Sequence, residues 1–535
     1  MKLPTPVQGF EKKDYFVALA LALFALIAYV RTLAPDILYG DSAEFQTQAY
    51  TFGITHSTGY PTYLLLGRLI GFLPIRSPAW RISLLSAICA AITVAGVYLL
   101  TRYFTSSRIG AVLGGVALGI SYTFWSQAVI AEVYTSGMAF LVVIMLLLFH
   151  WQTEARQRST SLFVAALLAG IGFGVHASVW LVAPPAIAFI LWTLWWQRAT
   201  SSEWLRSLSA GFIGAIAGLA IFLAAFLISD RLNPPTSFIR TTLEPSRTFW
   251  KLQPEDFDSP LERLKMTVFS VQWGDALFPG GGFSFAKELE HFGDRLTTIE
   301  FSPMVLLLAI IGLILMLIAN PVRGAFFPVH FLFSAFLFLN YQVDDKNIFY
   351  LSLYIPLAVA AGTGIGFVLE WIHHYLEPLS GRSYQLLYLL SVFFFITMVV
   401  QPSAAVRWKA LWAGAADFVT EDYPFPVKNL KEPRLGAQMH LAGMADNAVF
   451  VLDWRALFAT AYLAHVEKGM TNTLFLEAMP RGNDGKVATT LVTELKGYLQ
   501  EGRPVFTDQK YPGLEGNFRL LPAAGNLYKL SPGNQ

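Results

Sequence analysis

Apolar runs of about twenty residues recur along the chain from Tyr15 to Val400. A helix needs roughly 20 mostly apolar residues to cross a bilayer, because the hydrocarbon core is about 30 Å thick and each helical residue rises about 1.5 Å. The runs that fit are 15–32, 82–104, 109–127, 133–151, 161–175, 178–196, 208–229, 303–319, 324–340, 349–371 and 385–400. The sequence therefore predicts a polytopic α-helical membrane protein of about 11 spans.

The direction of these spans follows from the basic residues between them. The first run comes after Lys12 and Lys13 but is long and has no small-residue cleavage site behind it, so we interpret it as a retained first span rather than a signal peptide. With a cytoplasmic N-terminus, strict alternation places the short basic loops inside, as the positive-inside rule requires. These loops contain Arg102, Arg108, Arg156, Arg158, Arg198, Arg206, Arg323 and Arg382. We expect a multi-pass protein of a cell inner (cytoplasmic) membrane with its N-terminus in the cytoplasm.

After Gln401 the composition becomes that of a water-soluble domain. Strand-like runs at 449–453, 473–477 and 504–507 alternate with helical patterns, and 518–521 and 527–530 are further strand candidates. Strands that alternate with helices indicate a small α/β domain with parallel pairing. The predicted organisation is a transmembrane domain over 1–401 and an extracytoplasmic α/β domain over 402–535.

Composition excludes several functions. The 535 residues are 55% hydrophobic with a formal net charge of +2, and no dense Lys/Arg stripe indicates a nucleic-acid partner. The single cysteine, Cys89, allows neither a disulfide framework nor a cysteine-based metal site. The predicted spans carry almost no charged residues at mid-depth, whereas ion-coupled transporters usually bury ionisable groups there.

Two carboxylates stand out in the first outer loop, Asp41 and Glu44. Residues three apart share a helix face, so both could meet a hydroxyl-bearing acceptor just outside the bilayer, one of them as a general base. The alternative is that Asp41 caps a helix and Glu44 completes a capping box, which stabilises by about 1 kcal/mol. The local sequence leaves both accounts open.

The same loop continues with His56, Tyr60 and Arg68. His56 could bind a phosphate or orient a carboxylate, or be purely structural. Arg68 lies in the apolar stretch 63–73, which is typical of a helix at the membrane interface, where its guanidinium could bind a lipid phosphate or simply reach the headgroups.

Other predicted outer turns add polar candidates for substrate binding: Glu132, Tyr134, His176, Asp344 and Lys346. Each has an ordinary structural explanation, such as an anion at a helix N-terminus or a solvated turn residue. They gain weight because the inferred topology brings all of them to one face of the membrane.

These motifs resemble a family of polytopic GT-C glycosyltransferase-like proteins related to protein O-mannosyltransferases. The resemblance covers about 39–185 and is carried by Gly-Asp-Ser-x-Glu-Phe at 40–45, the segment 56–63 and the segment 124–135. The family usually has two prolines after the histidine, where this chain has Ser57 and Thr58.

The resemblance implies a GT-C fold and an inverting glycosyltransferase with Asp41 as base and Glu44 in support. The donor would be a polyprenyl-phosphate sugar and the acceptor a hydroxyl of a protein, glycan or lipid, in contact with membrane lipids. The leaving phosphate would be met by Arg68, helped by Arg240, Arg247 or Lys346, so we expect no metal ion and no cofactor. The alternatives are a membrane transporter and a noncatalytic glycan- or lipid-binding assembly subunit, and the sequence identifies neither sugar nor acceptor.

Overall fold

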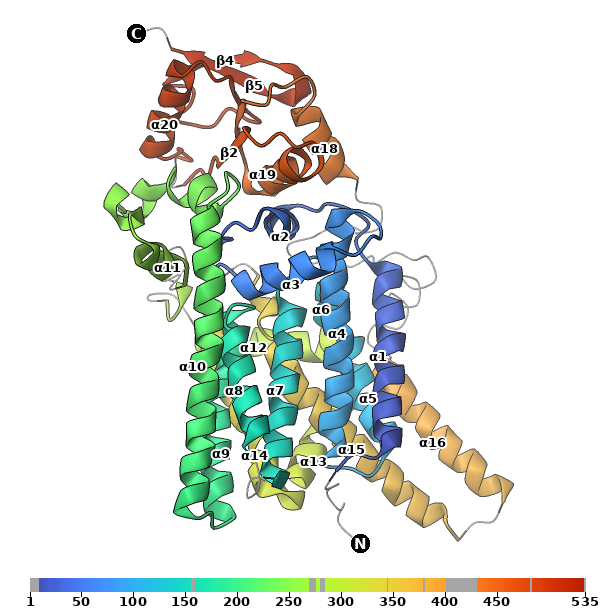
Figure 1. Ribbon diagram of the computed structural model, residues 1–535. Helices are drawn as coiled ribbons and strands as arrows, with labels where there is room; N and C mark the ends of the chain where they lie inside the picture. Colours follow the sequence, from blue (N-terminus) through green and yellow to red (C-terminus); the bar gives the residue numbers. More distant parts are fainter. Residues whose placement is uncertain are drawn as a thin grey trace.

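The computed structural model describes residues 9–154, 159–268, 276–279, 284–343, 345–378, 381–400, 431–481 and 484–533. The chain forms a long helical bundle with a small sheet domain seated on one end (Figure 1). The described chain starts at the opposite end of the bundle from that domain, and its C-terminus lies within the domain.

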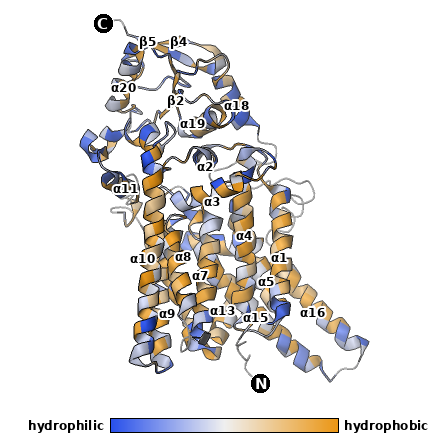
Figure 2. Ribbon diagram, viewed as in Figure 1, coloured by the Kyte–Doolittle hydropathy of each residue, from blue (hydrophilic) through white to orange (hydrophobic). Residues whose placement is uncertain are grey.

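Apart from the segment 285–300, the bundle is built from the apolar runs recognised in the sequence. Its elements are α1 (Lys12–Thr32), α4 (Pro78–Arg102), α5 (Arg108–Gly119), α6 (Tyr122–Ala128), α7 (Tyr134–Glu154), α8 (Thr160–Gly172), η1 (Ala177–Val182), α9 (Ala183–Trp196), α10 (Ser201–Leu232), α12 (Phe285–Arg295), η6 (Leu296–Glu300), α13 (Pro303–Ala319), α14 (Pro321–Leu339), α15 (Leu351–Leu376) and α16 (Arg382–Val400). Figure 2 shows their apolar residues along the length of the bundle and hydrophilic residues toward its ends.

Eight helices among the described residues are long and apolar enough to cross a membrane. Two bent pairs, α5 with α6 and the α12–η6 segment with α13, raise the number to 10 if each pair is one span, and the shorter α8 is also apolar. The prediction of a polytopic helical membrane protein is confirmed, while the count of about 11 spans stays a prediction.

Small residues allow the bundle helices to approach closely. Where α13 crosses α15, a Cβ atom added to Gly312 would lie 1.8 Å from the carbonyl oxygen of Ala360. A Cβ atom on Gly364 would lie 2.1 Å from the carbonyl oxygen of Leu308. Contact of this kind between backbones is the usual basis of helix packing in membranes, where apolar burial gives little driving force.

The sheet domain confirms the predicted α/β fold. Its elements are α18 (Glu432–His440), β1 (Val449–Leu452), α19 (Trp454–Ala461), η10 (Tyr462–Glu467), β2 (Leu474–Glu477), α20 (Thr489–Gln500), β3 (Val505–Thr507), β4 (Phe518–Pro522), η11 (Ala524–Asn526) and β5 (Tyr528–Pro532). The strand order is β2-β1-β3-β5-β4. Strand β1 pairs in parallel with β2 and β3, and β5 pairs antiparallel with β3 and β4. The predicted domain boundary at 401/402 lies outside the described residues.

The sheet domain sits on the first loop of the bundle, which contains α2 (Gly40–Thr51) and α3 (Pro61–Gly71) (Figure 1). Ile37, Ala43 and Ala79 belong to the same buried apolar cluster as residues of α18, α19 and η10. The N–H of Ala79 donates to the Tyr462 hydroxyl at 3.0 Å, and Arg434 pairs with both Asp36 and Glu467. The first loop and the sheet domain therefore pack as one interface, and this interface positions the site.

Candidate active site

Asp41 lies in the first turn of α2 without serving as its N-cap. The N-cap residue is Tyr39, no side chain caps this helix, and Gly40 enters it with a φ of 56°. The capping explanation for Asp41 and Glu44 is therefore not what the structure shows. The Asp41 side chain is 42% exposed, and one of its oxygens lies 3.5 Å from His56 Nε2.

His56 links the two carboxylates. Its Nδ1 lies 2.5 Å from Glu44 Oε2, and its backbone N–H donates to Glu44 Oε1 at 2.9 Å. Glu44 is fully buried, whereas Asp41 remains open. The turn that places His56 is closed by a 2.7 Å hydrogen bond from the N–H of Gly59 to the His56 carbonyl, and Gly59 has a φ of 80°, which a glycine adopts without strain. Glu44 thus anchors His56 while Asp41 faces open space.

Electrostatics keep His56 charged. Burial by itself lowers the pKa of the imidazole, but Asp41 and Glu44 oppose this effect and raise the pKa of His56 to about 9. At neutral pH the imidazolium therefore lies between two carboxylates and fixes both.

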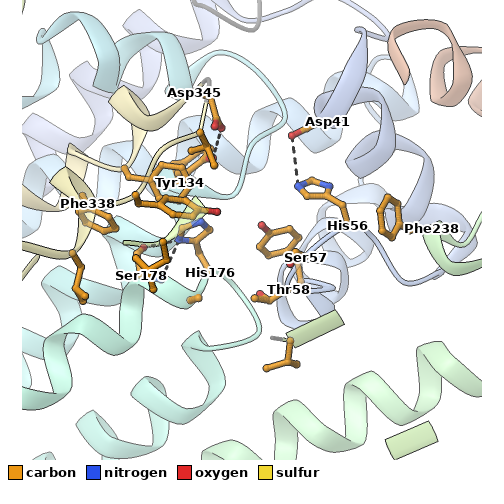
Figure 3. Close-up of a pocket in the computed structure, with 18 of the residues that line it drawn as sticks. Asp41, His56, Ser57, Thr58, Tyr134, His176, Ser178, Phe238, Phe338 and Asp345 are labelled. Carbon is orange, nitrogen blue, oxygen red and sulfur yellow. Dashed lines mark hydrogen bonds and ion pairs between the residues drawn. The ribbon is translucent and has the colours of Figure 1, made fainter. Parts of the chain in front are cut away.

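A pocket of about 630 Å³ opens beside Asp41 and His56. Figure 3 shows Asp41 and His56 on one side, facing Tyr134, His176 and Asp345 across it. Its lining comes from widely separated parts of the sequence: Asp41, His56, Ser57, Thr58, Tyr60, Tyr134, His176, Ala177, Ser178, Leu181, Phe238, Val268, Leu277, Leu337, Phe338, Tyr341, Val343, Asp345, Phe349, Trp454, Glu477 and Met479.

The wall opposite Asp41 is aromatic and polar. The hydroxyl of Tyr134 donates to Asp345 Oδ2 at 3.2 Å, and the ring of Tyr60 stacks on His176 with 6.0 Å between centroids. Burial and the nearby Asp41 raise the pKa of Asp345 to about 6, while burial lowers the pKa of His176 to about 3, so this imidazole is neutral. Stacked rings beside hydrogen-bonding groups are typical of the walls of ligand pockets.

The sheet domain supplies the third wall. Trp454 Nε1 donates to Asp41 Oδ1 at 2.7 Å, and Glu477 and Met479 also line the pocket. Burial raises the pKa of Glu477 to about 7. Sequence reasoning missed these residues because more than 400 positions separate Asp41 from Trp454. The available signal was their position at the ends of predicted strands, where sites in α/β domains often form.

The structure gathers the predicted residues only in part. Asp41, His56, Tyr60, Tyr134 and His176 line the pocket, and Glu44 contacts it through His56. The remaining candidates lie elsewhere: Glu132 accepts from Ser42 Oγ at 3.2 Å, Arg68 Nη1 donates to the Tyr50 carbonyl at 2.7 Å, and Lys346 Nζ pairs with Glu288 at 2.5 Å. Asp344 lies outside the described residues.

The predicted helpers for the phosphate also have protein partners. Arg240 donates to the Asn233 carbonyl, and Arg247 donates to the Glu244 carbonyl and pairs with Glu494. Within the part of the lining that the structure describes, His56 is the one cationic side chain. Over the same described ranges, no group of three or more His, Cys, Asp and Glu residues is arranged to hold a metal ion.

Two solved structures have a fold similar to that of this chain. The chain matches the crystal structure of ArnT from Cupriavidus metallidurans bound to undecaprenyl phosphate with a TM-score of 0.53 and 12% identity, over 98% of this chain and 100% of that one. It also matches the archaeal oligosaccharyltransferase AglB from Archaeoglobus fulgidus, in complex with an inhibitory peptide and a dolichol-phosphate. That match has a TM-score of 0.55 and 13% identity, over 93% of this chain and 70% of that one. At these identities the likeness concerns the fold alone.

Sequence comparison also finds similar proteins. Residues 41–201 match the model of the protein O-mannosyl-transferase TMEM260 N-terminal domain. The mouse protein O-mannosyl-transferase TMEM260 is 27% identical over 198 residues, 36% of this chain and 28% of the relative. The Dictyostelium discoideum protein O-mannosyl-transferase tmem260 is 23% identical over 353 residues, which are 62% of this chain and 41% of the relative. The expected resemblance to GT-C, protein O-mannosyltransferase-like proteins is thus confirmed, and the chain spans less than half the length of the curated relatives it matches.

Proposed function

We propose that this protein is an inverting glycosyltransferase that moves a sugar from a polyprenyl-phosphate donor to an acceptor hydroxyl. The observation that carries the proposal is the open Asp41 carboxylate at the edge of the pocket, held between His56 and Trp454. The relatives and the structural neighbours support the same enzyme class.

In the proposed reaction, one Asp41 oxygen accepts the proton of the acceptor hydroxyl while the acceptor oxygen attacks the anomeric carbon. The bond from that carbon to the phosphate oxygen breaks through an oxocarbenium-like state, and the polyprenyl phosphate leaves as an anion. Asp41 then returns its proton to water. Glu44 supports Asp41 indirectly, because it fixes His56, which contacts both carboxylates.

The binding roles follow the positions of the side chains. Tyr60, Tyr134 and the neutral His176 offer aromatic faces and hydrogen bonds to the sugar, and His56 offers a positive charge near the reacting centre. For the leaving phosphate we propose protein cations and no metal ion or cofactor. Arg68 and Lys346 stay candidates for that task, although they would have to exchange the partners they now have.

The pocket and the sheet domain share one end of the bundle (Figure 1). The described basic residues Arg102, Arg198, Arg323 and Arg382 lie at the ends of helices on the opposite side of the bundle. By the positive-inside rule, we propose a cytoplasmic N-terminus, a sheet domain outside the cytoplasmic membrane, and an acceptor of protein, glycan or lipid that approaches from outside.

The direct test is incubation of the purified protein with a panel of polyprenyl-phosphate hexoses, pentoses and aminosugars, followed by mass spectrometry of the donor. We expect one donor to be consumed, with and without a metal chelator. Asp41→Asn should lower the rate about 100- to 10,000-fold with donor affinity intact, since a positioned base contributes that much. Glu44→Gln should cost less rate because Glu44 acts through His56.

Asp258→Asn provides a matched control, because this exposed carboxylate lies outside the pocket. Near-wild-type turnover by Asp41→Asn, or a larger rate loss in Glu44→Gln, would remove Asp41 from the role of base. Donor that binds but is never consumed would favour the noncatalytic binding subunit, and donor moved across vesicles without consumption would favour the transporter.

A further inference from the structure

Trp454 is the first residue of α19 and reaches Asp41 from the other end of the chain. It follows β1 and Asp453, whose side chain accepts from the N–H of Ala456 at 3.0 Å and so fixes the start of the helix. From there the indole Nε1 donates to Asp41 Oδ1 at 2.7 Å. A donor at this distance from a carboxylate makes a strong, charge-assisted hydrogen bond.

The indole ring is held by aromatic contacts from three segments. Phe458 meets it edge to face at 5.1 Å, Phe238 at 5.9 Å and His56 at 6.0 Å between ring centroids. These three neighbouring rings restrict the movement of the indole away from Asp41. The N–H donor is therefore in place before any substrate binds, which is the condition for precise support of a reacting group.

The contact also makes the two oxygens of Asp41 unequal. Oδ1 accepts from Trp454, whereas Oδ2 has His56 Nε2 at 3.5 Å as its nearest charged neighbour. An indole N–H can only donate, so it cannot accept the acceptor's proton in place of Asp41. Oδ2 is thus the less tightly held of the two oxygens.

We propose that Trp454 is a positioning residue for Asp41, so that the sheet domain completes the active site of the bundle. The proposal rests on the proposed function. The catalytic geometry exists only while the sheet domain is docked, and its docking is secured by Arg434 with Asp36 and by Tyr462 with Ala79.

The test is Trp454→Phe, which keeps an aromatic ring and removes the N–H. We expect kcat to fall about 10- to 100-fold, the range for loss of a hydrogen bond to a charged group, with the donor KM unchanged. In an Asp41→Asn background the same substitution should cost no further rate, since the group it positions is gone.

The matched control is Trp180→Phe. Its indole donates to the Ala169 carbonyl at 3.1 Å and it does not line the pocket, so kcat and the donor KM should match the wild type. An unchanged kcat in Trp454→Phe, or an equal further loss in the Asp41→Asn background, would overturn the proposal and leave Trp454 a packing residue.

A second measurement needs no turnover. The ¹⁵N–¹H indole signal of Trp454, assigned by its disappearance in Trp454→Phe or by selective labelling, should change position in Asp41→Asn, because the charged acceptor of the N–H is gone. An indole signal at the same position in the wild type and in Asp41→Asn would contradict the hydrogen bond itself. If the signal changes in Asp41→Asn but the protein consumes no donor, the proposed function is refuted, and with it the catalytic role of the contact.

Discussion

His56 shows how one side chain can organise a site. Its ring lies between a fully buried carboxylate, Glu44, and an open one, Asp41. Burial of the imidazole alone would favour the neutral form, but two neighbouring negative charges outweigh that cost and keep it protonated. One charged ring then fixes the base and its anchor together.

The stability of the protein should therefore depend on the charge of His56. Its pKa is raised from the ordinary 6.5 to about 9 in the folded protein. A raised pKa contributes stability that is fully present below about 6.5 and is lost as pH rises through about 9. The thermal midpoint of the wild type should exceed that of His56→Gln at pH 6.5, and this advantage should shrink by about 2–4 °C by pH 9.5.

The control for this measurement is His291→Gln, because His291 is exposed and lies away from the pocket. Thermal midpoints recorded from pH 6.5 to 9.5 should follow the wild type for His291→Gln. A gap between the wild type and His56→Gln that stays constant across this range would contradict a charged His56.

At the scale of elements, glycines decide how closely the helices pack. In α13 and α15, Gly312 and Gly364 each face a backbone carbonyl of the other helix at a distance that no Cβ atom could occupy. The same helix α15 continues directly from the turn that carries Asp345, so its placement also sets one wall of the pocket.

Gly312→Ala should accordingly destabilise the bundle. The new methyl would meet the Ala360 backbone, which cannot move aside as a side chain could, and overpacking of this kind costs about 1–3 kcal/mol. Gly497→Ala in α20 is the matched control, since nothing lies within 4 Å of its Cβ position and alanine favours a helix by about 1 kcal/mol. Thermal unfolding in nanodiscs would compare them, and equal midpoints for Gly312→Ala and the wild type would show that α13 and α15 do not pack as described.

At the scale of the whole molecule, the bundle and the sheet domain form one site across their interface. The first loop contributes Asp41 and His56, and the sheet domain contributes Trp454 and Glu477. A site at one end of the bundle, beneath a polar domain, places the proposed chemistry where a lipid-linked donor in the bilayer and an acceptor in water can both arrive.

The proposed orientation can be checked with two engineered cysteines, since the native Cys89 is buried. The first variant, Glu515→Cys, changes an exposed residue of the sheet domain. The second, Ser202→Cys, changes an exposed residue in the first turn of α10, at the opposite end of the bundle. In intact cells an impermeant thiol reagent should label the first and not the second, while both should react after permeabilisation. If only Ser202→Cys is labelled, the orientation is the opposite of the proposed one, and the pocket faces the cytoplasm.

The features that could be predicted from the sequence are those that depend on neighbouring residues. Runs of apolar residues became the helices of the bundle because length and hydropathy are enough to require a helix in lipid. The predicted strands such as 449–453 and 504–507 appear as β1 and β3 because their apolar, β-branched composition is also local. The motif at 40–45 correctly indicated the GT-C likeness.

The positions and contacts of the candidate residues, by contrast, depend on three-dimensional packing. Glu44 lies buried behind His56, Arg68 binds a helix-end carbonyl outside the pocket, and Trp454 contacts Asp41 from 413 positions away. No local pattern encodes these outcomes, because each depends on which surfaces meet when the sheet domain docks on the first loop. Hydrophobic patterns specify which faces are buried, and the packing of distant segments then determines which side chains meet.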